Sequence, residues 1–254
     1  MTSIVAPLGP WEPAQPSEVA ALFSAMPCPW WVAGGYAIEL AIGRPLRDHG
    51  DIDVMVLRQD QLHVQRALHG WEWWAADPPG TLRRWHPREQ LRAGVHDIWC
   101  RPGPGEPWRI QVMIDETSDG DWVSRRDPAI RRPLSGIGKA SSDGIPYLAP
   151  EIQLFYKAKT PRPKDEADFT AVLPFLAEAQ LQWLSGALAR TFGEHPWRAA
   201  LAATRLESAN RRAAILAALG AAADGEPDLP PRRSPRVSRD SRERPLMRRD
   251  SYQH

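Results

Sequence analysis

The pattern of apolar and polar positions divides the chain into a strand-rich first part and a helical second part. Short apolar runs and alternating runs predict strands, whereas apolar residues spaced three and four apart predict helices. Strands are expected at residues 30–33, 51–57, 71–75, 95–101, 108–115, 122–126 and 145–148, and helices at 17–26, 36–42 and 59–68. Further helices are expected at residues 151–159, 163–176, 178–191, 196–204 and 206–222.

A sheet followed by a run of helices is typical of an α+β protein. We therefore expect a mixed-sheet domain over residues 17–148 and a helical domain over residues 149–222. Residues 224–254 hold eight arginines and five prolines, with no aromatic residue before Tyr252. This composition predicts a disordered Arg/Pro/Ser-rich tail, because the segment cannot bury enough apolar surface to offset its ordering entropy. The alternative is a weak arm for nucleic acid or an acidic partner, although interleaved Asp and Glu dilute its charge.

The overall composition narrows the class of protein. Hydrophobic residues make up 43% of the 254 residues and charged residues 25%, as in soluble globular proteins. No apolar run reaches the roughly 18 residues of a membrane-spanning helix, and the first residues lack the basic start of a secretory signal. With only Cys28 and Cys100, a disulfide framework and a cysteine-rich zinc site are excluded, and a cytoplasmic location is expected. The 32 basic and 31 acidic residues balance, so no net charge attracts nucleic acid.

Two acidic residues and a pair of glycines are the main indication of a metal- and phosphate-binding site in the sequence. Asp51 and Asp53 stand two apart on a predicted strand, so their side chains share one face and can jointly hold Mg²⁺. Gly34 and Gly35 lie between a predicted strand and a predicted helix. There the backbone can approach a phosphate closely, and the start of the helix offers free N–H groups.

A basic loop lies between the glycine pair and the two aspartates. It carries Arg44, Arg47 and His49, and arginine can bind a phosphate through two parallel hydrogen bonds. His49 is expected to orient a neighbour through a hydrogen bond rather than to bind a metal, because no second histidine stands at ligand spacing.

This ordered set resembles the polymerase-beta-like nucleotidyltransferase superfamily, and more closely the aminoglycoside 2''-adenylyltransferase type and its uncharacterised relatives. The first matching stretch consists of Gly34-Gly35, Gly43-Arg44 and Arg47-x-His49-x-Asp51-Ile52-Asp53. The second consists of residues 150–159 and of residues 162–169, which carry a Lys-Asp-x-x-Asp segment. The resemblance covers about residues 17–200 and implies a nucleotidyltransferase fold.

The resemblance also implies a chemistry, namely Mg²⁺-dependent transfer of a nucleoside monophosphate from ATP or another NTP to a hydroxyl group. Asp51 and Asp53 would then be the metal ligands, and Gly34 and Gly35 would face the triphosphate. The other residues expected to bind the nucleotide are Arg44, Arg47, His49, Lys157 and Lys164. For Lys164 the alternative is an ordinary surface helix with an ion pair to Asp168, four residues on.

The superfamily usually has a third carboxylate on a neighbouring strand, and here the chain departs from the pattern. Gln111 stands where an acidic residue is expected. Asp115 on the same strand face, or Asp97 on the partner strand, could take its place; Asp115 ranks first and Glu116 is a weaker candidate. Because four residues along a strand span roughly 13 Å, Asp115 could also lie too far from the metal.

The predicted function is transfer of an AMP-like group to a hydroxyl of a small acceptor, with an antibiotic as one candidate. A polynucleotide acceptor is disfavoured because the predicted folded part shows no basic stripe, and no membrane partner is expected. Two alternatives stay open. One is a catalytically weak or inactive nucleotide-binding protein on the same fold, motivated by Gln111. The other is a nucleotidyltransferase of the toxin–antitoxin type that modifies a protein.

The tail is predicted to be dispensable. Truncation after Ala223 removes eight arginines but little apolar surface, so the melting temperature should hardly change. Thermal unfolding of the full and truncated chains checks this, and a large drop in melting temperature would show that the tail packs against the rest of the protein.

Overall fold

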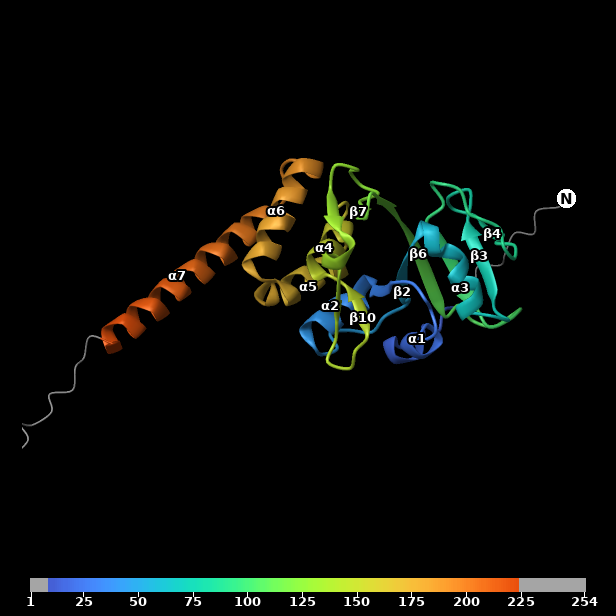
Figure 1. Ribbon diagram of the computed structural model, residues 1–254, viewed down its shortest axis with the longest axis horizontal. Coiled ribbons are helices and arrows are strands. Elements are labelled where there is room, and N and C mark those ends of the chain that lie inside the picture. Colours follow the sequence, from blue (N-terminus) through green and yellow to red (C-terminus); the bar gives the residue numbers. More distant parts are fainter. Residues whose placement is uncertain (1–8, 224–254) are drawn as a thin grey trace, which may run out of the picture. The chain divides into compact units, whose positions relative to one another are not determined.

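A ten-stranded mixed sheet is the centre of the fold in the computed structural model, which describes residues 9–223 (Figure 1). Its strands are β1 (Trp30–Ala33), β2 (Asp53–Leu57), β3 (Glu72–Ala76), β4 (Leu82–Arg84), β5 (Asp97–Arg101), β6 (Ile110–Ser118), β7 (Asp121–Val123), β8 (Arg131–Pro133), β9 (Gly138–Ala140) and β10 (Pro146–Leu148). The strand order is β4-β3-β5-β6-β2-β1-β10-β9, with β7 paired to β6 and β8 to β7. The pairs β1–β10 and β2–β6 are parallel and the others antiparallel, so the sheet is mixed as predicted.

Seven α-helices accompany the sheet in the described part of the chain. They are α1 (Pro16–Leu22), α2 (Gly34–Ile42), α3 (Gln61–Ala67), α4 (Pro150–Lys157), α5 (Pro163–Val172), α6 (Glu178–Phe192) and α7 (Trp197–Ala223). Three 3₁₀ turns are η1 (Arg58–Asp60), η2 (Leu134–Gly136) and η3 (Leu173–Phe175). Strands and helices thus follow one another as an α+β fold. Among the described helices, none combines the length and the apolar character needed to cross a membrane.

Strand β2 shows how the core is built, because its side chains alternate between two apolar layers. Val54 and Val56 belong to a cluster with residues of α1 and α3. Met55 and Leu57 belong to a second cluster, which includes residues of α4, α5 and α6. All four side chains are fully buried. The strand that carries Asp53 at its start is therefore fixed from both faces.

Several details of the secondary structure differ from the prediction. Strand β2 begins at Asp53, so Asp51 precedes the strand instead of lying on it. The helices predicted at residues 196–204 and 206–222 form one helix, α7, because the sequence around Arg205 contains neither glycine nor proline to end the first one. Strands β4, β8 and β9 were not predicted, since three residues are too few to establish an alternating pattern.

The chain divides into a unit of residues 1–211 and a unit of residues 212–254. The predicted boundary between a sheet domain and a helical domain near residue 148 stays a prediction. The predicted tail, residues 224–254, lies outside the described residues.

Strand pairing brings the candidate site residues to one end of the sheet. Strand β1 leads into α2 at Gly34, and its last residue, Ala33, pairs with Asp53 of β2. On the other side of β2, Asp53 pairs with Gln111 of β6. Asp97, the first residue of β5, follows one strand further along.

Candidate active site

The turn at Gly34 makes direct contact with a predicted metal ligand. Gly34 has a φ of +67°, a conformation that side chains rarely adopt. A Cβ added there would lie 2.3 Å from Oδ2 of Asp53, so any other residue would strain the turn and displace the Asp53 carboxylate. Its N–H donates a hydrogen bond of 2.8 Å to Oε1 of Gln153 on α4. The turn is therefore held between β2 and α4, with Asp53 against it.

Gly35 allows the basic loop to approach in the same way. A Cβ at Gly35 would lie 2.4 Å from Nη2 of Arg47 and 2.4 Å from Cε1 of His49. The loop itself is held by Glu39 of α2, which accepts hydrogen bonds from the backbone N–H groups of Leu46 and Arg47. The two glycines thus have separate roles, one toward Asp53 and the other toward the loop.

A cavity of about 570 Å³ opens at this end of the sheet. Gly34, Gly35 and four carboxylates, from Asp51, Asp53, Asp97 and Asp165, line it. Seven cationic side chains share its wall: Arg47, Arg125, Arg126, Lys157, Lys159, Arg162 and Lys164. A glycine turn at the start of a helix, grouped carboxylates and several cations together suit a metal-bound triphosphate.

The surroundings of Asp53 disfavour its ionised form. Burial, with the negative charges of Asp51 and Asp97, raises its pKa to about 7 against the opposing effect of Lys157 and Lys164. The ionised carboxylates therefore repel one another. A bound cation would relieve this repulsion, so the donor set fits Mg²⁺, which prefers oxygen ligands.

Three of the carboxylates fit a particular kind of metal site. Within the described part of the chain, Asp51, Asp53 and Asp97 do not form a group whose ligand atoms all lie within 4.8 Å of one another. Mg²⁺ is usually bound by one or two carboxylates together with substrate phosphates rather than by a cage of protein ligands. The protein alone therefore offers no compact three-carboxylate cage here, and an ion in this cavity would need phosphate oxygens as further ligands.

The Lys-Asp-x-x-Asp segment holds cationic side chains of the cavity in place through ion pairs. Asp168 is buried and lies 2.9 Å from Nζ of Lys157 and 3.2 Å from Nη2 of Arg47. It is these two residues, rather than Lys164, that pair with Asp168. Lys164 lines the cavity itself. The alternative of an ordinary surface helix does not hold, because Asp168 fixes two cations of the cavity.

Asp165 adds a second anchor at the start of α5. Its buried carboxylate accepts the backbone N–H of Arg162 at 3.0 Å and pairs with Nζ of Lys157 at 2.9 Å. Burial alone would raise the pKa of Asp165. The hydrogen bonds from Arg162 and Lys157 outweigh burial and hold that pKa well below its usual range. Asp165 thus stays charged and keeps Lys157 in place.

Asp115 does not reach the cavity, which corrects its ranking as the first candidate for the third carboxylate. It is fully buried. Its Oδ2 accepts hydrogen bonds from Trp122 Nε1 at 2.7 Å and from the Tyr156 hydroxyl at 2.6 Å, and its Oδ1 lies 2.9 Å from Nε of Arg125. Two residues along β6 from Met113, it lies beside Leu57 at the far end of β2. Its role is to hold Arg125, which does line the cavity.

Asp97, the second candidate for the third carboxylate, does reach the cavity. It lines the cavity, and Nε2 of Gln111 lies 3.4 Å from its Oδ1. Gln111, next to Asp53 across the parallel pair, therefore contacts the carboxylate of the following strand. A carboxylate thus lies beside Gln111 on the following strand, and its part in metal binding stays a prediction.

Three other predicted residues lie outside the cavity. Arg44 follows Gly43, whose φ of +79° ends α2 and turns the chain away, and Arg44 lines a different cavity. His49 stacks on Tyr36, with its Nε2 2.8 Å from Glu39, and so orients the loop rather than facing the nucleotide site. Glu116 pairs with Arg58 at 2.6 Å.

Several cavity residues were not found from the sequence. They are His96, Arg125, Arg126, Gln153, Tyr156, Lys159, Thr160 and Arg162. Lys159 and Arg162 lie in or next to the second matching stretch and could have been singled out there. Arg125 and Arg126 follow β7, a strand whose place in the sheet the local pattern does not reveal.

Comparison with known proteins gives one family and a set of distant structures. A family model described as Aminoglycoside-2''-adenylyltransferase matches residues 17–172, more than half of the chain. No curated protein matches the chain. A lincosamide antibiotic adenylyltransferase with bound lincomycin is 16% identical, with a TM-score of 0.45 over 63% of this chain and 95% of that one.

Two further structures are similarly distant. ANT(2'')-Ia in complex with adenylyl-2''-tobramycin is 16% identical, with a TM-score of 0.45 over 68% of this chain and 95% of that one. An antigenic nucleotidyltransferase-like protein from Paracoccidioides brasiliensis is 16% identical, with a TM-score of 0.40 over 73% of this chain and 88% of that one.

The structural role of Asp115 can be tested by its stability effect. Asp115→Ala should lower the free energy of unfolding by about 3 kcal/mol, because it leaves a largely buried Arg125 without its carboxylate. Asp97→Asn, whose side chain lines the cavity, is the matched control and should change stability little. Urea unfolding of the two variants checks this. Equal stability of Asp115→Ala and the unchanged protein would contradict the role.

Proposed function

Because the chain belongs to the aminoglycoside-2''-adenylyltransferase family, we propose that it moves a nucleoside monophosphate from an NTP to a hydroxyl of a small acceptor. AMP from ATP is the expected group, and the reaction is proposed to require Mg²⁺. The observation that carries this proposal is the shared cavity, where the Gly34-Gly35 turn and the carboxylates of Asp51, Asp53 and Asp97 meet.

Asp51, Asp53 and Asp97 are the residues that would hold Mg²⁺. The ion, when bound, would neutralise charge on the phosphate oxygens, which is a main requirement of phosphoryl-type transfer. Asp53 has a second property relevant to the reaction. Burial and the charges of Asp51 and Asp97 raise its pKa to about 7, so a bound cation would favour its ionised form.

The cationic side chains divide into two groups. Arg47 and Lys157 are held by Asp168, so they present fixed charges. By contrast, Arg126, Lys159 and Lys164 have no ion pair within residues 9–223 and are available for phosphate oxygens. We propose that the fixed charges orient the triphosphate and that the available ones neutralise it, since the reaction depends mainly on positioning and charge.

The charge of the cavity also bears on the acceptor. Four carboxylates line it, from Asp51, Asp53, Asp97 and Asp165. Asp165 is already paired with Lys157 and Arg162, and the other three are assigned to the metal. None is left to pair with the amines of a polycationic acceptor, so the proposed acceptor is a neutral or anionic small molecule with a hydroxyl.

The experiment is a transfer assay with labelled ATP and other NTPs against a panel of hydroxylated acceptors in Mg²⁺. Lincomycin and tobramycin, the latter a polycation, serve as probes of acceptor charge, and the protein itself is tested as an acceptor. Asp51→Asn and Asp53→Asn should each lower turnover at least ~100-fold. A metal is worth several kcal/mol in such reactions, and about 1.4 kcal/mol is tenfold in rate.

The chain provides its own matched control in a second Asp-x-Asp, Asp119-Gly120-Asp121, at the turn from β6 into β7. Asp119→Asn and Asp121→Asn should leave turnover unchanged. Retained turnover in both Asp51→Asn and Asp53→Asn would overturn the metal assignment. Nucleotide binding with no transfer to any acceptor would favour the inactive binding protein, and labelling of a protein would favour the protein-modifying enzyme.

A further inference from the structure

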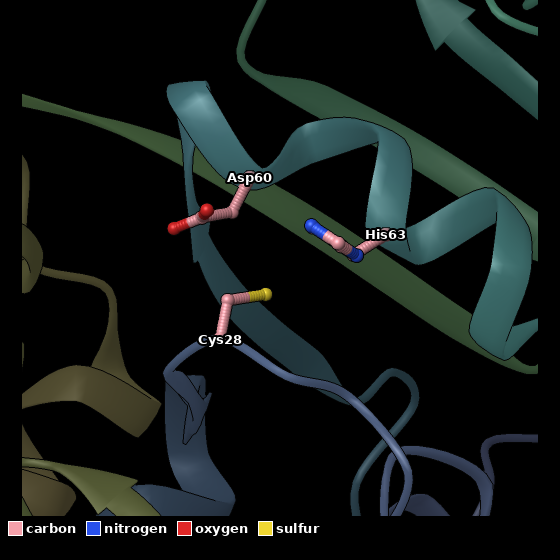
Figure 2. A group of neighbouring side chains, drawn as sticks. All are labelled: Cys28, Asp60 and His63. Carbon is pink, nitrogen blue, oxygen red and sulfur yellow. The ribbon is translucent and has the colours of Figure 1, made fainter.

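Three side chains of metal-binding type come together away from the cavity. Cys28 lies in the segment before β1, Asp60 ends η1, and His63 is in α3. One ligand atom from each lies within 4.8 Å of the other two. Figure 2 shows the thiol, the carboxylate and a ring nitrogen gathered between the loop and the helix. Among the described residues, no other group of three meets this condition.

The position of this cluster is opposite to that of the proposed active site. In the β1–β2 pair, Trp30 lies beside Val56, whereas Ala33 lies beside Asp53. Cys28 precedes β1 and Asp60 follows β2, so both belong to the end away from Gly34 and Asp53. None of the three residues lines the active-site cavity. The cluster is therefore a separate feature of the same two strands.

The Asp60 carboxylate is the second observation that points to a ligand. Asp60 immediately precedes α3, a place where an aspartate usually accepts a backbone N–H, yet its side chain makes no such bond. Its Oδ2 is shielded from solvent and has no hydrogen-bond partner within the described part of the chain. A shielded carboxylate oxygen without a donor is costly unless something else satisfies it.

Cys28 is held in place by its neighbours in the sequence. Pro27 and Pro29 flank it, and each proline fixes its own φ. Burial, together with the Asp60 charge, raises the pKa of the Cys28 thiol to about 11, so the thiol keeps its proton until a cation displaces it. Cys100, the other cysteine, is fully buried elsewhere in the core.

We propose that Cys28, Asp60 and His63 bind a divalent transition cation of the zinc type. Thiolate, imidazole and carboxylate are the ligands zinc uses, and three protein ligands leave one position for water. Ligand atoms sharing one zinc ion lie roughly 4.4 Å apart or less, given Zn–S of about 2.3 Å and Zn–N of about 2.1 Å. A small side-chain adjustment closes the cluster from its present spacing.

Binding of the cation changes the protonation of Cys28 and the contact between Arg66 and His63. Cys28 releases its thiol proton to solvent and binds as the thiolate. Nη1 of Arg66 lies 3.3 Å from Nδ1 of His63 in an exposed contact, and Arg66 moves aside if the ion takes that nitrogen. The ion then links the segment before β1 to the segment after β2. Since it binds only the folded chain, it should raise the melting temperature.

The test uses the full chain with Co²⁺ and Zn²⁺ in excess Mg²⁺, which occupies oxygen-rich sites. We expect one ion per chain by equilibrium dialysis, a near-ultraviolet cobalt–thiolate charge-transfer band, and a higher melting temperature with Zn²⁺. Cys28→Ser should abolish the band. Cys28→Ser and His63→Gln should each weaken Zn²⁺ binding at least ~10-fold, the lower end of the loss caused even by changes around a ligand.

Two controls separate this site from others. His69→Gln changes an exposed histidine just after α3, and Asp53→Asn changes the proposed Mg²⁺ site; both should keep the band and the affinity. The site is overturned if no ion binds, if the band survives in Cys28→Ser, or if Asp53→Asn abolishes binding. Loss of affinity in His63→Gln with normal thermal unfolding of the metal-free variant supports it independently of Cys28.

Discussion

The contact between Gly34 and Asp53 is the constraint on which the active site depends. No side chain fits between the turn and the carboxylate, since a Cβ would lie 2.3 Å from Oδ2 of Asp53. The antiparallel pairing of β1 and β2 brings the two residues together, and two apolar layers fix β2. A phosphate against the turn would therefore lie next to the carboxylate proposed to bind the metal, which is the proximity that nucleotidyl transfer requires.

The electrostatics of the cavity follow from that contact. Asp51, Asp53 and Asp97 concentrate negative charge, as the raised pKa of Asp53 shows. Opposite them, Asp168 fixes Arg47 and Lys157, and Asp115 fixes Arg125. The carboxylates thus have two roles: Asp51, Asp53 and Asp97 face the cavity, whereas the buried Asp115 and Asp168 hold cations that face it. Removing a carboxylate of the second kind leaves an unpaired cation and costs stability, whereas the first kind is available for a metal.

The sequence predicted the parts of the site that are close together along the chain. The glycine turn, the Asp51–Asp53 pair and the α+β order could be derived from local patterns. The third carboxylate could not, because choosing between Asp97 and Asp115 requires the register of β5 against β6.

The partners of Asp168 were missed for a similar reason: Lys157 and Arg47 lie on other elements, while Lys164 is the neighbour that helical spacing suggests. The cluster of Cys28, Asp60 and His63 joins segments on either side of two strands, and no short motif marks it.

The most direct test of the active-site account is a crystal structure with Mg²⁺ and a non-transferable ATP analogue. The account predicts Mg²⁺ bound by Asp51, Asp53 and Asp97, with the triphosphate against Gly34 and Gly35 and in contact with Lys164. Asp115 should keep its contacts with Trp122, Tyr156 and Arg125. Mg²⁺ bound without Asp53, or a triphosphate placed outside this cavity, would contradict the account.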